Sequence, residues 1–458
     1  MQKNIFLNSK RPHVLLITNH GVHDWEIRGG LIDTGGQNHY VLSLSDTLVA
    51  LGFKVTTFNR GGFLDPLTKK MRSGIQYKDG HSRIAYLKGG LEEFIRKEDM
   101  DIETLSHEAK HAEMILSEEG TPIDLIISHY WDGALLGSII KKRMNLDAKH
   151  AWVPHSLGAL KMENSKDMLF EEMDNLHLDE RIAYERDALL RVDAVASTSG
   201  DISRVLEDFY DYIPQLFCPP CVGTDGIYPN CENDPEEIYD FLMDTDFVSG
   251  KNARGRFCIL EISRTDSTKR KDILIRAFGN CLAEHPDTML LLRLDPTNKV
   301  VYNNIVDLIE DLDIRDNVIL VGGLTEKLKP KIFGISDLYV CTSEMEGFGS
   351  SVQEACAARK ATISSDLTPF AVQYLLQDER MESLETEAGW CTIRWGSGGV
   401  VVPAGNVEGF SRAINKMISD HKLRESIAKT GHEITIPHFT WENMVRSLLE
   451  QMKITIPK

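Results

Sequence analysis

The segment from residue 13 to residue 59 constrains the fold more than any other part of the chain. The run "HVLLIT" (13–18) is apolar throughout, and a glycine-containing loop follows it. Residues 37–51 then place apolar side chains at helical spacing, and "FKVTTFN" (53–59) is a second strand-like run. A strand, loop, helix and strand in this order form a βαβ unit with parallel strands. The sequence therefore predicts an α/β fold.

The same alternation continues along the chain and then restarts in its second half. Further strand-like runs lie at 124–131, 193–199, 257–263, 288–294, 317–323, 337–343 and 361–366, with a helical stretch at 271–284. A polar, acidic segment at 230–256 interrupts the pattern, and 458 residues suffice for two domains. We expect two Rossmann-like, doubly wound parallel-sheet domains at 1–225 and 257–435, joined by a linker at 226–256. Residues 436–458 should form a C-terminal helix, which could cross back to the first domain.

Charge and hydropathy narrow the classes of function. The formal net charge is −18, whereas proteins that bind nucleic acid or anionic membranes normally present a basic face. The apolar run near the N-terminus is about six residues long, too short for a signal peptide or a membrane span. The sequence therefore predicts a cytoplasmic protein with small-molecule substrates, and it does not indicate an oligomeric state.

The cysteines give little sign of a metal or redox site. Only Cys218 and Cys221 have CxxC spacing, and no second such pair completes a zinc ligand set. An ordinary loop is the favoured interpretation of "CPPC", and a metal or redox role is the alternative.

Two polar loops follow strand-like runs, where doubly wound folds bind ligands and where a cleft between domains is expected. In "DTGGQ" (33–37), Gly35 and Gly36 could bring backbone N–H groups to an anion at a helix N-terminus, or they could form a tight turn. In "SRTDSTKRKD" (263–272), Arg264 and Lys269 are five positions apart and would suit a diphosphate. A solvated charged loop is the alternative.

The segment "EGFGSSVQEA" (346–355) holds two carboxylates eight positions apart. A capping box of Ser350 with Gln353, or of Ser351 with Glu354, would start a helix there, and the second of these would account for Glu354. It does not account for Glu346 or for the glycines beside it. Because ionised carboxylates only accept hydrogen bonds, two of them near one ligand suit the hydroxyl groups of a sugar or ribose.

Weaker candidates lie in the first predicted domain. His155 follows a short apolar stretch in "VPHSLG", and a lone histidine is more often structural than functional. Lys161, Arg181 and Arg186 lie close to it in the sequence, where helical charges usually face solvent. The combination of a Gly-pair loop, an Arg/Lys pair and a two-carboxylate helix entry describes a nucleotide-diphosphate sugar held across a cleft.

These motifs resemble those of retaining glycosyltransferases of the GT-B family 4, over nearly the whole chain. The family's E-x7-E motif is similar to Glu346 and Glu354, and its phosphate-binding pair to Arg264 and Lys269. "GGVVVPAGNVEGFSRAI" (398–414) and "FTWENM" (439–444) resemble its late segments. The first-domain motifs "DTGGQ", "HSLGALK" and "ERIAYE" are most similar to sucrose-phosphate synthases and mannosylfructose-phosphate synthases.

The resemblance implies a GT-B fold and a hexosyltransferase that uses a nucleotide-diphosphate sugar, such as UDP-glucose or GDP-mannose, and a phosphorylated acceptor. The implied catalytic residues are Glu346, His155, Arg264 and Lys269; the implied donor-binding residues are Gly35, Gly36, Arg264, Lys269, Gly347, Phe348, Gly349 and Glu354; the implied acceptor-binding residues are Gln37, Lys161 and Arg181. The fold needs no metal or cofactor, and "DTD" (244–246) is interpreted as accidental. Base recognition is expected near "VGGL" (321–324).

Departures from the family pattern leave the substrates open. "SSV" follows "EGFG" where leucine with proline or threonine is usual, and "PPCVGTDGIYP" (219–229) replaces the usual "PPG-V-D". Three alternatives remain from the sequence: an enzyme acting on a lipid or envelope polysaccharide acceptor, a phosphorylase of similar fold, and a non-catalytic nucleotide-sugar-binding protein.

Overall fold

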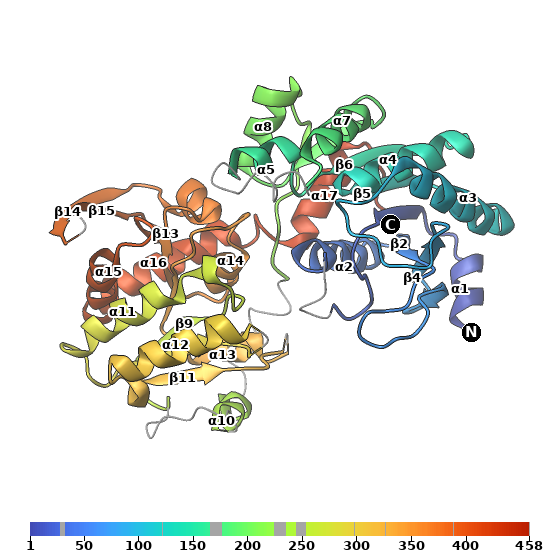
Figure 1. Ribbon diagram of the computed structural model, residues 1–458. Coiled ribbons are helices and arrows are strands. Elements are labelled where there is room, and N and C mark those ends of the chain that lie inside the picture. The colour runs from blue at the N-terminus through green and yellow to red at the C-terminus, as the bar shows by residue number, and fades with distance from the viewer. Residues whose placement is uncertain are drawn as a thin grey trace. The chain divides into compact units, whose positions relative to one another are not determined.

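The computed structural model describes residues 1–27, 33–120, 122–164, 176–223, 235–243, 253–296, 298–325, 327–387 and 389–457. The chain forms two compact units (Figure 1). Unit 1 comprises Met1–Pro220 and Trp441–Lys458, and unit 2 comprises Cys221–Thr440. The "DTD" segment, Cys231 and most of the predicted linker lie outside the described residues.

The core of unit 1 is a sheet with eight described strands in the order β3-β4-β2-β1-β5-β6-β7-β8. The strands are β1 (His13–Thr18), β2 (Lys54–Gly61), β3 (Gly74–Tyr77), β4 (Ser82–Lys88), β5 (Leu125–His129), β6 (Lys149–Val153), β7 (Ala194–Ser197) and β8 (Leu216–Phe217). Neighbouring strands are parallel except β3 with β4. The strand order reverses between β1 and β5, so the loops after these two strands lie at the topological switch point.

The helices of unit 1 are α1 (Gln2–Asn8), α2 (Gly36–Ala50), α3 (Ile102–Glu119), α4 (Tyr130–Arg143), α5 (Gly158–Asn164), α7 (Leu178–Leu189), α8 (Gly200–Tyr210) and α17 (Trp441–Gln451). Helices α3, α4, α7 and α8 share one apolar core with the sheet. The C-terminal helix α17 packs against α2 (Figure 1). The rings of Trp441 and Tyr40 pack edge to face, with their centroids 4.8 Å apart.

Unit 2 also has a sheet with eight described strands, in the order β11-β10-β9-β12-β13-β16-β15-β14. The strands are β9 (Cys258–Glu261), β10 (Met289–Arg293), β11 (Val318–Val321), β12 (Leu338–Cys341), β13 (Ala361–Ser365), β14 (Arg380–Thr386), β15 (Gly389–Trp395) and β16 (Val400–Val402). The pairs from β11 to β16 are parallel, and β14 and β15 add an antiparallel hairpin at one edge. The switch point lies between β9 and β12.

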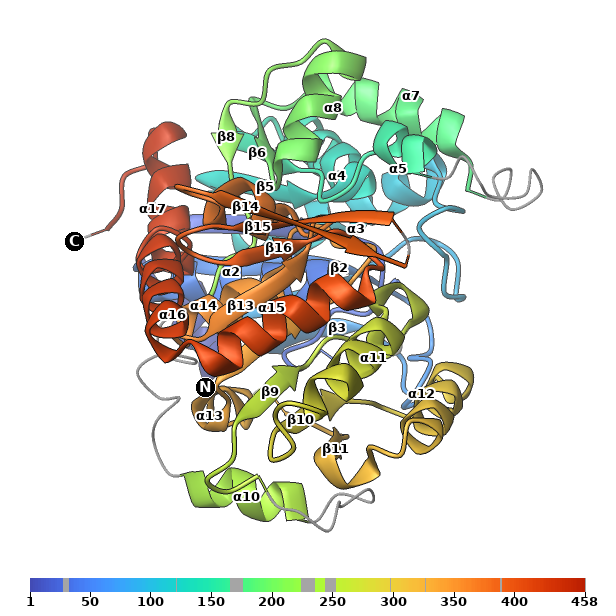
Figure 2. The same ribbon diagram turned by 90° about the vertical axis from the view of Figure 1, so that its left-hand side faces the viewer.

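The helices of unit 2 are α10 (Pro235–Met243), α11 (Lys271–Leu282), α12 (Lys299–Asp311), α13 (Lys329–Ile335), α14 (Ser350–Ala357), α15 (Val407–Ser419) and α16 (His421–Thr435). Helices α11 and α15 run side by side against the sheet (Figure 2). Helices α10, α13 and α14 contribute to a second apolar cluster with the strands. The predicted fold of two doubly wound parallel sheets is therefore confirmed. None of the described helices is both long and apolar enough to cross a membrane.

Three details differ from the sequence predictions. The strand expected at 124–131 ends at His129, because Tyr130 and Trp131 already belong to α4. Helix α10 lies inside the predicted linker 226–256, where acidic residues open a helix whose Ile238 and Leu242 are buried. The β14–β15 hairpin was not predicted.

Candidate active site

Two loops of unit 2 lie together at its switch point, one after β9 and one after β12. The hydroxyl of Thr342 donates a hydrogen bond to the carbonyl of Arg270 at 2.8 Å, and the N–H of Glu344 donates to the carbonyl of Thr268 at 2.8 Å. These contacts join loops that are about 75 residues apart in sequence. The "SRTDSTKRKD" and "EGFGSSVQEA" segments therefore belong to one site.

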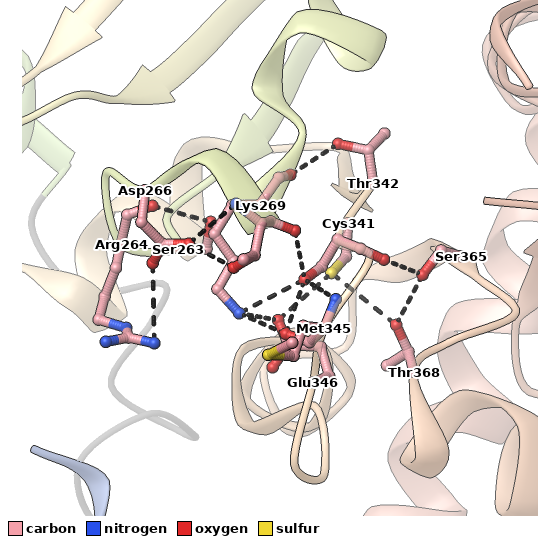
Figure 3. Close-up of polar contacts among 12 residues, drawn as sticks. Ser263, Arg264, Asp266, Lys269, Cys341, Thr342, Met345, Glu346, Ser365 and Thr368 are labelled. Atoms are coloured by element: carbon pink, nitrogen blue, oxygen red, sulfur yellow. Dashed lines mark hydrogen bonds and ion pairs between the residues drawn. The ribbon is translucent and has the colours of Figure 1, made fainter. Parts of the chain in front are cut away.

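Lys269 and Glu346 form the centre of this site (Figure 3). The Lys269 Nζ donates to Glu346 Oε1 at 2.7 Å and to the carbonyl of Met345 at 3.0 Å. The Lys269 side chain is 7% exposed and that of Glu346 is 14% exposed. The predicted phosphate-binding cation therefore contacts the first carboxylate of the E-x7-E motif.

Arg264 lies apart from this pair. Its side chain is 82% exposed and reaches Asp266, with 3.7 Å between Nη2 and Oδ2. Figure 3 shows its guanidinium separate from Lys269 and Glu346, with a contact drawn to Asp266. The structure brings Lys269 to Glu346 but does not bring Arg264 to Lys269. An exposed arginine on a loop can turn toward an arriving phosphate at little cost.

A buried ion pair beneath this loop was missed in the sequence. The Lys271 Nζ contacts the Glu261 carboxylate and donates to Ser263 Oγ at 3.1 Å. Both side chains are at most 2% exposed. Burial lowers the pKa of Lys271, and the charge of Glu261 opposes that shift. A charged residue in the strand "FCILEIS" was the one available signal, because a lone carboxylate in an apolar strand needs a partner.

Helix α14 begins differently from the predicted capping box. Its N-cap is Gly349, whose φ of 103° lies in the left-handed region that favours glycine, and no side chain caps it. A Cβ at this position would lie 2.6 Å from Thr368 Cγ2. Neither Ser350 nor Ser351 acts as the cap, so the capping-box expectation was wrong. Glycine is suited to this N-cap position because its lack of a Cβ leaves space for the side chain of Thr368.

Glu354 has a different partner from the one expected. Its Oε1 accepts a hydrogen bond from Lys329 Nζ at 3.0 Å, with both side chains at most 20% exposed. Lys329 opens α13, so this pair connects α13 to α14. The second carboxylate of the E-x7-E motif is therefore held by a lysine that the sequence did not single out.

The residues between the two carboxylates divide into core and open positions. The Phe348 side chain is 4% exposed and packs with the rings of Phe370, Tyr374 and Phe439. It serves the core, and only its backbone remains for the predicted donor contact. A Cβ on Gly347 would meet no described atom within 4 Å, so among the described residues the backbone there is open to a ligand. In the "VGGL" turn, the N–H of Gly323 already donates to Asp295 Oδ1 at 3.2 Å.

In unit 1, the "DTGGQ" loop leads into α2 after the switch-point strand β1. Gly35 has an extended φ of 174°, and its N–H donates to Asn38 Oδ1 at 2.9 Å. Neither Gly35 nor Gly36 adopts a φ in the left-handed region, which removes the tight-turn explanation, and a Cβ on either would meet no described atom within 4 Å. Gln37 donates from Nε2 to Thr18 Oγ1 at 3.1 Å. The glycine backbone at this helix start is open to an anion.

His155 lies at the carboxyl edge of the same sheet, just after β6. The N–H of Ser156 donates to the carbonyl of Pro154 at 2.7 Å, so His155 is the centre of a tight turn with a φ of 57°. Its Nε2 lies 2.9 Å from Nδ1 of His129, the last residue of β5. Burial lowers the pKa of His155 to about 3, and the nearby His20 adds to the effect. The imidazole is therefore neutral at physiological pH.

The two predicted acceptor cations line one small cavity. It is lined by Lys97, Glu98, Met100, Tyr130, Trp131, Lys161, Leu176, His177, Glu180, Arg181 and Tyr184. Lys97, a third cation there, was missed because it lies in a polar segment without periodicity. Glu98 Oε1 lies 3.0 Å from Lys97 Nζ and 3.7 Å from Lys161 Nζ. Burial alone would raise the pKa of Glu98, but the hydrogen bond from Lys97 lowers it overall.

Arg181 is held in place by Glu185 on the same helix. Glu185 Oε1 accepts from Arg181 Nε at 2.8 Å, and its carboxylate also accepts from the N–H of Gly158 and the hydroxyl of Tyr210. The Arg181 guanidinium lies 4.5 Å from the ring centre of Tyr130. Far from being a solvated helix charge, Arg181 is 6% exposed. By contrast Arg186, the other candidate of this segment, donates to the carbonyl of Phe209 at the surface.

The described residues give no support to a metal or redox role of "CPPC". Cys218 is 1% exposed, and burial raises the pKa of its thiol to about 12. A thiol with such a pKa supplies little of the thiolate that disulfide exchange needs. Among the residues that the structure describes, no group of three or more histidine, cysteine or acidic side chains could hold a metal ion.

Comparisons with known proteins support the family resemblance. Residues 243–434 match the family model described as "Glycosyl transferases group 1". A mannosylfructose-phosphate synthase from Agrobacterium fabrum is 26% identical over 365 residues, which cover 77% of this chain and 76% of that protein. A probable sucrose-phosphate synthase from Thermosipho melanesiensis is 25% identical over 347 residues, covering 73% and 76%.

A similar solved structure is the sucrose-phosphate synthase from Thermosynechococcus elongatus. The TM-score is 0.70 at 22% identity, and the match covers 97% of this chain and 98% of that one. This likeness confirms the predicted GT-B fold class. The predicted resemblance is confirmed as well: residues 243–434 match the glycosyl transferases group 1 model, in a chain similar to sucrose-phosphate and mannosylfructose-phosphate synthases.

Proposed function

We propose that this protein is a retaining hexosyltransferase that transfers glucose or mannose from a nucleotide-diphosphate sugar to a phosphorylated sugar. The observation that carries the acceptor class is the cavity of unit 1, where Lys97, Lys161 and Arg181 meet. In a chain with a net charge of −18, three cations around one cavity, beside the carboxylates of Glu98 and Glu180, support a local site for an anion.

The cavity would have to widen to admit the phosphate of such an acceptor. Its free volume is about 10 Å³, which is room for about one water molecule. A phosphate group is larger, so its binding requires the 3.7 Å contact between Lys161 and Glu98 to open. The phosphate would then replace Glu98 as the partner of Lys161, while Arg181 stays fixed by Glu185.

The donor side rests on the loops at the switch point of unit 2. Lys269 and Arg264 would stabilise charge on the leaving diphosphate, and the open backbone at Gly347 would approach the sugar. Glu346 would accept hydrogen bonds from sugar hydroxyls, and Glu354 from ribose hydroxyls. The bond between the sugar's anomeric carbon and the diphosphate breaks, the acceptor hydroxyl oxygen bonds to that carbon on the same face, and its proton passes to the leaving phosphate oxygen.

The test is an activity matrix with purified full-length protein. The donors are UDP-glucose, GDP-mannose and ADP-glucose, and the acceptors are hexose 6-phosphates, their dephosphorylated forms and water. We expect turnover with at least one donor and a marked preference for phosphorylated acceptors. Equal use of phosphorylated and free hexoses would contradict the acceptor class, and absence of turnover with every pair would contradict the proposed function.

A further inference from the structure

His129 makes one described side-chain hydrogen bond, and it goes to His155. The two rings are stacked, with centroids 5.1 Å apart and Nδ1 of His129 2.9 Å from Nε2 of His155. His129 is fully buried, and within the part of the chain that the structure describes its Nε2 has no partner. Because the described hydrogen bond of the buried His129 ring goes to the His155 ring, we expect His129 to orient His155.

The surroundings leave both rings uncharged. The Tyr40 ring packs edge to face on both, with its centroid 5.8 Å from that of His129 and 4.8 Å from that of His155. The carboxylate of Asp132 contacts His20 and not His129 or His155, with 3.2 Å between Asp132 Oδ2 and His20 Nδ1. Burial lowers the pKa of His129 well below its usual range, and the neighbouring histidines add to the effect. A proton is therefore shared between two neutral rings, and one ring must donate while the other accepts.

The unpartnered Nε2 of His129 decides the direction of this hydrogen bond. If His155 donated from Nε2, His129 would carry its own proton on Nε2, as a buried N–H without an acceptor. If His129 donates from Nδ1, its Nε2 is a bare lone pair, and orphaned buried N–H groups are rarer than under-satisfied acceptors. The second arrangement leaves the proton of His155 on Nδ1.

We infer that His129 is a positioning residue that holds His155 as its Nδ1–H tautomer, so that His155 meets the substrate as a hydrogen-bond donor. This inference rests on the proposed function and on the catalytic role that the family resemblance implies for His155. It assigns His155 a lone-pair-bearing partner, a hydroxyl or phosphate oxygen. The strained turn at His155, with its φ of 57°, directs the ring from the end of β6.

The direct test is the ring ¹⁵N spectrum of histidine-labelled full-length protein, with the His155 signals assigned from the His155→Gln variant. We expect His155 to show a protonated Nδ1 and a bare Nε2 at neutral pH. A protonated Nε2 on His155, or a fast mixture of both tautomers, would overturn the inference. This measurement needs no substrate, so it stands or fails independently of the proposed function.

Substitutions give a second, kinetic test. His129→Phe keeps an aromatic ring at this position but removes the hydrogen bond to His155. His129→Asn instead places a side-chain amide near the position of Nδ1. We expect His129→Phe to mix the tautomers of His155 and to lower kcat about tenfold or more with little change in donor KM, and we expect His129→Asn to recover part of the loss.

The matched control is His150→Phe. His150 is equally buried in the same sheet, and its Nε2 lies 2.7 Å from Ser128 Oγ instead of a site residue. This variant should lose stability without changing the His155 tautomer. If His129→Phe retains both the wild-type tautomer and the wild-type kcat, the inference is wrong. Should His129→Phe not fold, the wild-type spectrum and His129→Asn still decide the matter.

Discussion

The Lys269 Nζ lies 2.7 Å from Glu346 Oε1, so two residues predicted to act on different parts of the donor neutralise each other in the described structure. Lys269 is bound between this carboxylate and the carbonyl of Met345, while Arg264 extends into solvent. In the proposed reaction the two cations of the motif would therefore contribute differently: Lys269 is already held in the site, and Arg264 would have to move toward a diphosphate.

This difference gives the first prediction. Arg264→Ala should lower kcat roughly 10²-fold by removing a charge-assisted contact in the transition state, and it should leave Tm unchanged because the side chain is exposed. Lys269→Ala should lower kcat comparably and also lower Tm, because it leaves Glu346 without its cation. Steady-state kinetics and thermal unfolding of both variants check this. Near-normal turnover in both would exclude the phosphate role.

Glu346→Gln is the second prediction. The amide oxygen can still accept from Lys269, so Tm should change little, but the amide nitrogen no longer accepts from a sugar hydroxyl. We expect a large loss of kcat. The control is Glu344→Gln, which alters a carboxylate two residues away that is 42% exposed and paired with Arg270; it should keep wild-type activity. If Glu346→Gln mainly lowers Tm, the motif is structural.

The third prediction concerns the acceptor cavity. Lys161→Ala should raise the acceptor KM and leave the donor KM nearly unchanged. The fold should tolerate this change, because the Lys161 side chain is 32% exposed and its partner Glu98 remains paired with Lys97. The control is Lys141→Ala, which removes a lysine paired with Asp193 outside the cavity. Removing the acceptor's phosphate should cost the wild type far more than the Lys161→Ala variant, and a cost that is the same for both would contradict the assignment.

Arg181→Ala should behave differently, because Arg181 is buried against Glu185. Breaking a buried ion pair from one side leaves an uncompensated charge and costs about 3–5 kcal/mol. Both Arg181→Ala and the double variant with Lys161→Ala should therefore raise the acceptor KM and also lower Tm, so Lys161→Ala alone is the cleaner probe.

The fourth prediction concerns stability at acid pH. Burial lowers the pKa of His13, His23, His129, His150 and His155 in the folded state. In the unfolded chain these groups bind protons below about pH 6.5, whereas His23, His150 and His155 stay neutral in the folded state down to about pH 3. Stability should therefore be lost as pH falls below 6.5, by about 1.4 kcal/mol per pH unit for each such histidine.

Unfolding midpoints measured from pH 7.5 to pH 5 check this expectation. His150→Asn should flatten the pH dependence, and His421→Asn, which changes a histidine that is 72% exposed, is the control. A midpoint independent of pH over this range would contradict the buried neutral state.

The fifth prediction concerns metal ions. If side chains and helix termini supply the positive charge at the diphosphate, activity should survive excess EDTA. Complete loss that Mg²⁺ or Mn²⁺ restores would contradict this proposal. The control is the same titration with EDTA already saturated with Ca²⁺, which separates chelation from ionic effects.

The sequence predicted the strands well because their signal is local. "HVLLIT" and "ATISSD" are short, apolar and bounded by polar loops, and they form β1 and β13 almost as expected. The end of β5 was missed because Tyr130 and Trp131 extend the apolar run, although the chain turns there into α4. Apolar character alone does not separate a buried strand from the first turn of a buried helix.

The candidate site was less predictable, because its contacts join distant segments. Spacing placed Arg264 and Lys269 as a pair, but the burial of Lys269 depends on Glu346, 77 residues away. Likewise the partner of Glu354 is Lys329 on another helix, and Lys97 reaches the cavity from a segment without regular pattern. A motif identifies which residues matter, whereas tertiary packing decides which of them meet.

The position of α17 has a consequence for dissecting the chain. Its buried residues Met444, Val445, Leu448 and Leu449 belong to unit 1, although all of unit 2 intervenes in the sequence. A fragment ending at Pro220 would expose the apolar surface that α17 covers and should aggregate on expression. The Cys221–Thr440 fragment is continuous and keeps its own sheet, which makes it the better candidate for separate production. A circular permutant that joins Lys458 to Met1 would turn unit 1 into a single uninterrupted stretch.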